Sequence, residues 1–310
     1  WWLVKEILRF NKLCKKSYQA KNYDKSSTLG EFLQKNDFGY YFAEHYILPM
    51  GAAIWSSSLV QMQDFQFHFF VKFFHNHGLL NIADRPQWYV VPGGSRSYLA
   101  PLCEPFVDNI HLNADIKKIT RENNQVQLCF ANGEVQTFDE VVIACHSDQA
   151  LALLGDASQH EQEILGAIPY SENSVVLHTD INLLPKRKKA WASWNYQLSA
   201  NRAKPASVTY NMNILQGLNS SHTFCVTLNQ REDIEPSKIL REFIYHHPVF
   251  STDSINAQQQ RLAICGQQHT HFAGAYWYSG FHEDGVRSAV DVAQRFDCYL
   301  QQSGPSQNNG

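Results

Sequence analysis

The sequence lacks the cysteine pairs that hold zinc sites and disulfide frameworks together. Its seven cysteines are scattered, odd in number and never arranged as CxxC, which favours a reducing compartment, the cytoplasm. The formal net charge is −3, so a global basic field that would attract nucleic acid is missing. No apolar run reaches the roughly 18 residues of a membrane span, because His68 and Lys72 interrupt the longest aromatic stretch.

Two further features are missing. A dinucleotide-binding fold normally opens with a strand, a G-x-G-x-x-G turn and a helix, and no segment here has that pattern; Gly93-Gly94 lacks the spacing. The chain opens at Trp1 within a helical pattern, without Met or a signal peptide. We therefore expect it to be a piece of a longer protein.

What the sequence does contain is typical of a globular protein, with 44% hydrophobic and 13% aromatic residues. The patterns divide it into five segments. We expect a helical segment at 1–88, a β-rich segment at 89–155, strands and helices at 156–262, a closing strand, glycine loop and helix at 263–302, and a loose tail at 303–310.

Individual elements can be predicted within these segments. Thr28 and Glu31 have the spacing of a capping box at a helix start, and Asn132-Gly133 is a hairpin signal. Alternating or wholly apolar runs predict strands at 110–112, 116–120, 126–130, 135–138, 141–144, 175–178, 207–212 and 224–228, and a helix at 236–245.

The most informative segment lies near the C-terminus. Glycines 274, 280 and 285 surround Glu283 and Asp284, and acidic side chains are favoured at a helix start. An apolar helix face follows at spacings of three and four: Val286, Ala289, Val290, Ala293, Phe296 and Leu300. Because glycine lets backbone N–H groups approach a ligand, such an end can hold a phosphate, a ribityl chain or a carbonyl oxygen. An ordinary capped helix is the open alternative.

Aromatic residues and histidines carry weaker signals. The aromatic residues Phe65, Phe67, Phe69, Phe70, Phe73, Phe74, Trp191 and Trp194 suit an apolar tunnel or a hydrophobic core, and we favour the core. No metal site is expected, because no cysteine or carboxylate stands at ligand spacing near His75 and His77. The basic run 186–189 is predicted to be a solvated loop rather than a docking patch.

Five ordered blocks, at 48–56, 91–98, 141–151, 192–195 and 274–288, give the sequence a family resemblance. Together they resemble the predicted NAD/FAD-binding flavoproteins of the amine-oxidase and phytoene-desaturase superfamily. They look most like the group found beside, or fused to, cyclopropane-fatty-acid synthases. The resemblance implies a mixed α/β fold of the p-hydroxybenzoate-hydroxylase type, lacking its first βαβ unit, with an interleaved substrate domain. The fragment alone would then bind FAD weakly and be inactive.

The resemblance also implies which residues hold FAD. The strand around Ile116 would supply main-chain contacts near the adenine, and Ala144 and Cys145 would end a strand beside the cofactor. The closing turn would face the flavin pyrimidine edge and ribityl chain, through Gly274, Ala275, Tyr276, Gly280, Phe281, His282, Glu283, Asp284, Gly285 and Val286.

One departure bears on the reaction. Many amine oxidases place a lysine near flavin N5, whereas the strand at 174–178 has none. We therefore expect hydride transfer between flavin and an apolar, fatty-acyl substrate, in desaturation, saturation or isomerisation. His178 and His282 are the catalytic candidates, each weighed against simple packing. Two alternatives stay open: an accessory module that guides a cyclopropane-fatty-acid-synthase-like methyltransferase to lipid, and a degenerate fold that no longer binds FAD.

Overall fold

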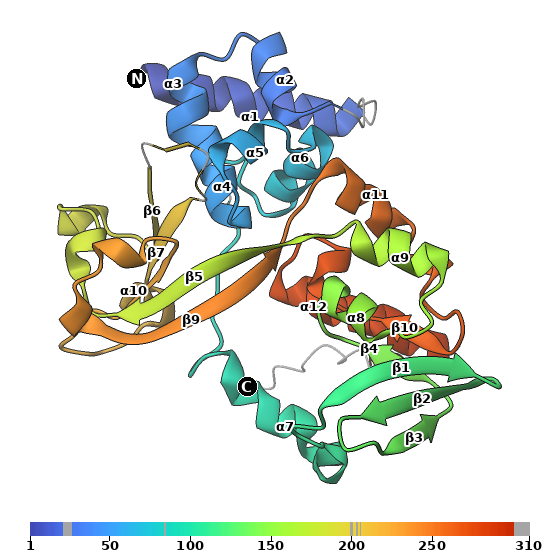
Figure 1. The fold of residues 1–310 in the computed structure, drawn as a ribbon. Helices are drawn as coiled ribbons and strands as arrows, with labels where there is room; N and C mark the ends of the chain where they lie inside the picture. The colour runs from blue at the N-terminus through green and yellow to red at the C-terminus, as the bar shows by residue number, and fades with distance from the viewer. Residues whose placement is uncertain (21–26, 84, 199–200, 203, 205, 301–310) are drawn as a thin grey trace, which may run out of the picture. The chain divides into compact units, whose positions relative to one another are not determined.

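The computed structural model describes residues 1–20, 27–83, 85–198, 201–202, 204 and 206–300 (Figure 1). The chain forms two compact units, each built from two separate stretches of sequence. Unit 1 comprises Trp1–Ile110 and Tyr170–Thr252, and unit 2 comprises His111–Pro169 and Asp253–Gly310. The predicted tail at 303–310 lies outside the described residues.

The first stretch of unit 1 is helical, as predicted. Its main helices are α1 (Trp2–Ala20), α2 (Leu29–Lys35), α4 (Leu48–Trp55), α5 (Leu59–Gln63) and α6 (Phe67–Asn76). The predicted capping box at the start of α2 is confirmed, because Thr28 Oγ1 accepts from the Glu31 amide and Glu31 accepts from the Thr28 amide. Shorter helical turns, α3 (Tyr40–Phe42) and a π-helical segment at Ala43–Ile47, precede α4.

The aromatic residues of this stretch make its core. Phe10, Phe70 and Phe74 are almost completely buried and stack on one another or on neighbouring rings. Phe65, Phe67 and Phe73 are buried in the same cluster. The core interpretation of these phenylalanines is therefore confirmed, and burying them supplies the dominant stabilisation of the helices.

The second stretch of unit 1 is an antiparallel sheet of order β6-β7-β8-β5-β9. Its strands are β5 (Tyr170–His178), β6 (Trp194–Gln197), β7 (Ser207–Asn211), β8 (Cys225–Leu228) and β9 (Ile239–Pro248). The helix predicted at 236–245 is wrong, since that segment is mostly β9. Its backbone groups pair with β5 from Tyr170↔Pro248 to His178↔Ile239, and this pairing overrides the local helical pattern.

Unit 2 contains a meander of β1 (Ile116–Glu122), β2 (Gln125–Phe130) and β3 (Val135–Phe138). These strands and the turn before β3, where Gly133 has a φ of +84°, follow the prediction. The strand predicted at 110–112 is wrong. It follows a 3-10 helix, left-handed residues Asn113 and Asp115 come after it, and it pairs with none of the described strands.

Helices complete unit 2 around a short parallel pair, β4 (Val141–Ile143) and β10 (Thr270–Phe272). They are α8 (Ser147–Leu153), α9 (Gln159–Gly166), α11 (Thr252–Gln259) and α12 (His282–Ala293). One 3-10 turn extends α12 before the left-handed Asp297 ends it, so placing Leu300 on this helix was wrong. The side chains that α12 buries are Ser288 and Val292.

Two general properties complete the description. None of the helices in the described part of the chain has the length and apolar character of a membrane span. All seven cysteines are free thiols, and three of them are buried.

Candidate functional site

Two parallel strands of unit 2 end side by side at the predicted cofactor site. β4 and β10 pair in register, and the Ala273 amide continues the pairing by donating to the Ile143 carbonyl oxygen at 3.0 Å. Ala144 and Cys145 follow one strand, and Gly274 follows the other. The carboxyl ends of parallel strands are the usual place for a ligand in such sheets.

The turn after β10 is fastened to the helix that follows it. The Gly274 amide donates to Ser288 Oγ at 2.8 Å, and that hydroxyl donates to the Gly285 carbonyl oxygen at 2.7 Å. Gln258 Nε2 donates to the Tyr276 carbonyl oxygen at 2.7 Å. The Tyr276 side chain is itself buried, with 3% exposed. The turn is therefore held in one conformation by hydrogen bonds within unit 2.

Arg261 is a supporting residue that the sequence analysis missed. Its Nη2 donates to the carbonyl oxygens of Phe272 and Ser288, at 2.9 and 2.8 Å, and its Nη1 pairs with Asp291 at 2.7 Å. Asp291 also accepts from the Tyr278 hydroxyl. One guanidinium thus joins β10, α12 and the turn, and no spacing rule in the sequence points to it.

The start of α12 is the exposed part of this turn. Asp284 Oδ2 accepts from the amides of Phe281 and Ser279, at 3.0 and 3.2 Å, and so caps the helix. Gly280 has a φ of +89°, a conformation that favours glycine. Within the described residues, the Glu283 amide meets no acceptor, as is usual in a first helical turn. The end of the helix therefore offers a free N–H group and a partial positive charge.

Gly274 and Gly285 differ in whether protein packing requires a glycine. A Cβ on Gly274 would overlap the Tyr276 ring, so packing alone requires that glycine. A Cβ on Gly285 would lie 3.9 Å from Ala275 Cβ, an ordinary contact. Protein packing therefore does not require glycine at 285, which is consistent with space left for a ligand.

The remaining predicted residues lie elsewhere or take up other contacts. Ile116 opens β1 and pairs with Phe130, on a sheet separate from β4 and β10. Burial, opposed by a backbone hydrogen bond, raises the pKa of the Cys145 thiol, so that thiol is not an activated nucleophile. Val286 and His282 are exposed on α12.

His178 lies fully buried in the sheet of unit 1. Its Nε2 lies 2.7 Å from Thr227 Oγ1, and its Nδ1 accepts from the Asp180 amide at 3.1 Å. Burial lowers the pKa of His178, although the nearby Asp180 carboxylate opposes this. The ring is therefore neutral near pH 7, with its Nε2 hydrogen donated to Thr227. Roles for His178 and His282 in the reaction stay predictions.

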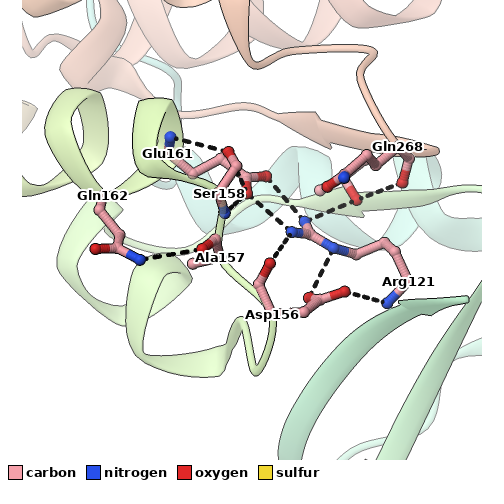
Figure 2. Close-up of polar contacts among 8 residues, drawn as sticks. Arg121, Asp156, Ala157, Ser158, Glu161, Gln162 and Gln268 are labelled. Atoms are coloured by element: carbon pink, nitrogen blue, oxygen red, sulfur yellow. Dashed lines mark hydrogen bonds and ion pairs between the residues drawn. The ribbon is translucent and has the colours of Figure 1, made fainter.

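A buried ion-pair network braces unit 2 near the start of β10 (Figure 2). Arg121 pairs with Glu161 through two contacts of 2.8 Å and with Asp156 at 2.9 Å. Its Nη1 also lies 3.4 Å from Thr270 Oγ1. Burial alone would raise the pKa of the Glu161 carboxyl, but hydrogen bonds from Arg121 and the Ser158 amide, with the Arg121 charge, hold it below its ordinary value.

Comparison with known proteins identifies the fold. The profile of the family described as flavin containing amine oxidoreductase matches residues 5–192, more than half of the chain. No curated protein matches significantly. Two solved structures illustrate the likeness, which at these identities concerns the fold alone. A CLA-producing fatty acid isomerase from P. acnes has 16% identity and a TM-score of 0.55, over 87% of this chain and 73% of its own. Cyclohexylamine oxidase from Brevibacterium oxydans has 12% identity and a TM-score of 0.62, over 95% and 76%.

The cofactor of this family is FAD, and the residues of the turn fit it. The exposed Glu283 amide and the positive end of α12 suit an electron-rich carbonyl oxygen or a phosphate. Packing does not require glycine at 285, and the ends of β4 and β10 lie in the same unit. If this turn were only an ordinary capped helix start, the cap would explain Asp284. It would not require glycine at 285.

Proposed function

The chain belongs to the family of flavin-containing amine oxidoreductases, and from that premise we propose that it transfers hydride between FAD and an apolar, fatty-acyl substrate. The substrate would be desaturated, saturated or isomerised. The observation that carries the proposal is the exposed start of α12, where no described residue accepts from the Glu283 amide and packing does not require glycine at 285. The absence of lysine from β5 (Tyr170–His178) supports an acyl substrate over an amine, and a fatty acid isomerase shares the fold, as do amine oxidases.

In this proposal, Ala144, Cys145 and the segment from Gly280 to Val286 would hold the isoalloxazine. FAD supplies the group that accepts and returns hydride. The Glu283 amide and the helix end would stabilise negative charge on a flavin bound there, which would ease hydride acceptance. The Asp284 carboxylate holds two amides of the turn, so it positions the turn rather than moving a proton. Its neighbour His282 is exposed on α12.

An anaerobic titration tests this function. The purified flavoprotein is mixed with unsaturated and saturated fatty-acyl lipids, and in parallel with primary amines. We expect acyl lipids to bleach the flavin absorbance or to be converted to shifted double-bond isomers, detected by mass spectrometry after derivatisation. Primary amines are expected to do neither.

The same experiment can contradict the proposal. Bleaching by amines, with no change in any acyl lipid, would assign amine oxidation instead. A full-length protein that purifies colourless and takes up no FAD would favour the degenerate-fold alternative.

We further propose a methyltransferase partner and a cytoplasmic location. The resemblance to proteins found beside or fused to cyclopropane-fatty-acid synthases supports the partner, and seven free cysteines support a reducing compartment. Co-purification of this protein with a synthase of that type tests the partner. Retained lipid modification in a flavin-free variant would favour the accessory-module alternative over catalysis.

A further inference from the structure

A groove of about 640 Å³ runs along the outer side of α1 in unit 1. Its lining combines apolar and polar side chains: Leu8, Leu13, Leu80 and Ile82, with Asn11, Lys12, Lys15, Lys16 and Gln19. This volume falls within the range of sites that hold small apolar ligands. The groove belongs to unit 1, whereas the residues assigned above to FAD belong to unit 2. Its lining residues also lie far from those residues in the sequence.

Among the described residues, the charged side chains that line this groove are all lysines. Its lining includes three lysines and no acidic residue. Glu6, the acid of α1, is already bound by Arg9 at 2.6 Å. Among the described residues, no carboxylate lies within ion-pair distance of Lys12, Lys15 or Lys16. A chain with a net charge of −3 therefore carries a local basic patch here.

Exposed apolar side chains continue the same stripe of the helix. Val4, Leu8, Lys12 and Lys15 follow one another at spacings of three and four, which places them on one face. Leu8 is 49% exposed, and Ile82 beside the groove is 58% exposed. The opposite face of α1 packs into the core through Phe10 and other buried side chains. The outer stripe is thus an exposed apolar surface beside cations.

We propose that this face of α1, together with Ile82, docks onto the surface of an anionic phospholipid bilayer. Leu8 and Ile82 would enter the boundary between headgroups and acyl chains, and the three lysines would contact the phosphates. Charge complementarity selects this occupant, since a neutral apolar partner would leave the lysines unpaired. The inference rests on α1 and Ile82 alone and stands independently of the proposed reaction.

Vesicle sedimentation tests the proposal with the full chain. Vesicles of phosphatidylcholine are compared with vesicles that also contain phosphatidylglycerol, and binding is expected only to the second kind. Because each lysine near such a surface strengthens binding about fivefold, Lys12→Gln/Lys15→Gln/Lys16→Gln should weaken it roughly a hundredfold. Leu8→Gln/Ile82→Gln should weaken binding to the same vesicles by tenfold or more, as two inserted side chains are lost.

A matched control comes from the exposed basic run of the same unit. Lys186→Gln/Lys188→Gln/Lys189→Gln removes the same charge from a loop outside the groove, and it should leave vesicle binding within about twofold. Equal losses in both triple variants would overturn the proposal, because binding would then follow net charge. Binding to soluble dodecyl phosphate or to an acidic protein, with none to vesicles, would overturn it too. Circular dichroism checks that each variant is folded.

Discussion

Arg121 and Glu161 form a two-pronged ion pair, with both contacts at 2.8 Å and only 4% and 3% of their side chains exposed. The two residues are 40 positions apart in sequence. Their pairing joins β1 to α9 inside unit 2, the unit that contains the closing turn. Removing one partner would leave a charge buried without compensation.

The first prediction concerns this pair. Arg121→Met is expected to lower the free energy of unfolding of unit 2 by about 3–5 kcal/mol, as measured by urea denaturation. The control is Lys117→Met, since the Lys117–Asp115 pair at 2.6 Å is 61% and 56% exposed. That change should cost less than about 1 kcal/mol. Equal effects of the two substitutions would contradict a structural role for the buried pair.

The second prediction concerns pH. Burial lowers the pKa of His178 below its ordinary 6.5, so between the two values the unfolded chain binds a proton that the folded chain does not. The stability contributed by the neutral ring is complete above about pH 6.5 and is lost as pH falls through the folded pKa. His178→Gln should flatten the decline in unfolding free energy below pH 6.5. An identical pH profile in both proteins would contradict the burial of a neutral ring.

The third prediction compares two adjacent serines in unit 1. Ser57 Oγ and Trp55 Nε1 are buried with no hydrogen-bond partner in the described structure, beside a cavity of about 30 Å³. Ser57→Ala should therefore be neutral, or stabilise by up to about 1 kcal/mol, because an unsatisfied hydroxyl is removed. Ser58 caps α5 by accepting from the Gln61 amide, so Ser58→Ala should cost about 1 kcal/mol.

Thermal and urea unfolding of the two serine variants measure this difference. A loss of stability in Ser57→Ala as large as that in Ser58→Ala would show that an ordered water satisfies the hydroxyl. The cavity is large enough for one water molecule.

Much of the fold was predictable because its signals are local. The capping box at Thr28, the strands of the meander and the turn at Gly133 each depend on residues a few positions apart. β9 was mistaken for a helix because its conformation is fixed by pairing with β5, about 70 residues away in sequence. Pairing at such a separation leaves no periodic signal in the sequence.

The candidate site likewise contains some residues that the sequence predicts and others that it does not. Gly280, Asp284 and Gly285 could be found from their spacing, since a helix start has a recognisable composition. The residues that hold the turn in place could not, because Arg261 and Gln258 reach it from a different segment.

The fourth prediction concerns the space at Gly285. Gly285→Ala should keep or slightly raise stability, by up to about 1 kcal/mol, since alanine favours a helix. It should also weaken FAD binding at least tenfold, measured by flavin fluorescence titration, because the proposed flavin lies beside this residue. Gly166→Ala is the control, as its Cβ would likewise make an ordinary contact, 3.8 Å from Leu151. Equal FAD affinities in the two variants would argue against a ligand beside Gly285.

The most direct measurement is amide hydrogen exchange with and without FAD. If the free N–H at the start of α12 faces the flavin, saturating FAD should slow exchange across Gly280 to Val286. Exchange at the start of α9, where Ser158 and Glu161 already cap the helix, should be unchanged. FAD binding that leaves exchange at Gly280 to Val286 unaltered would contradict the account.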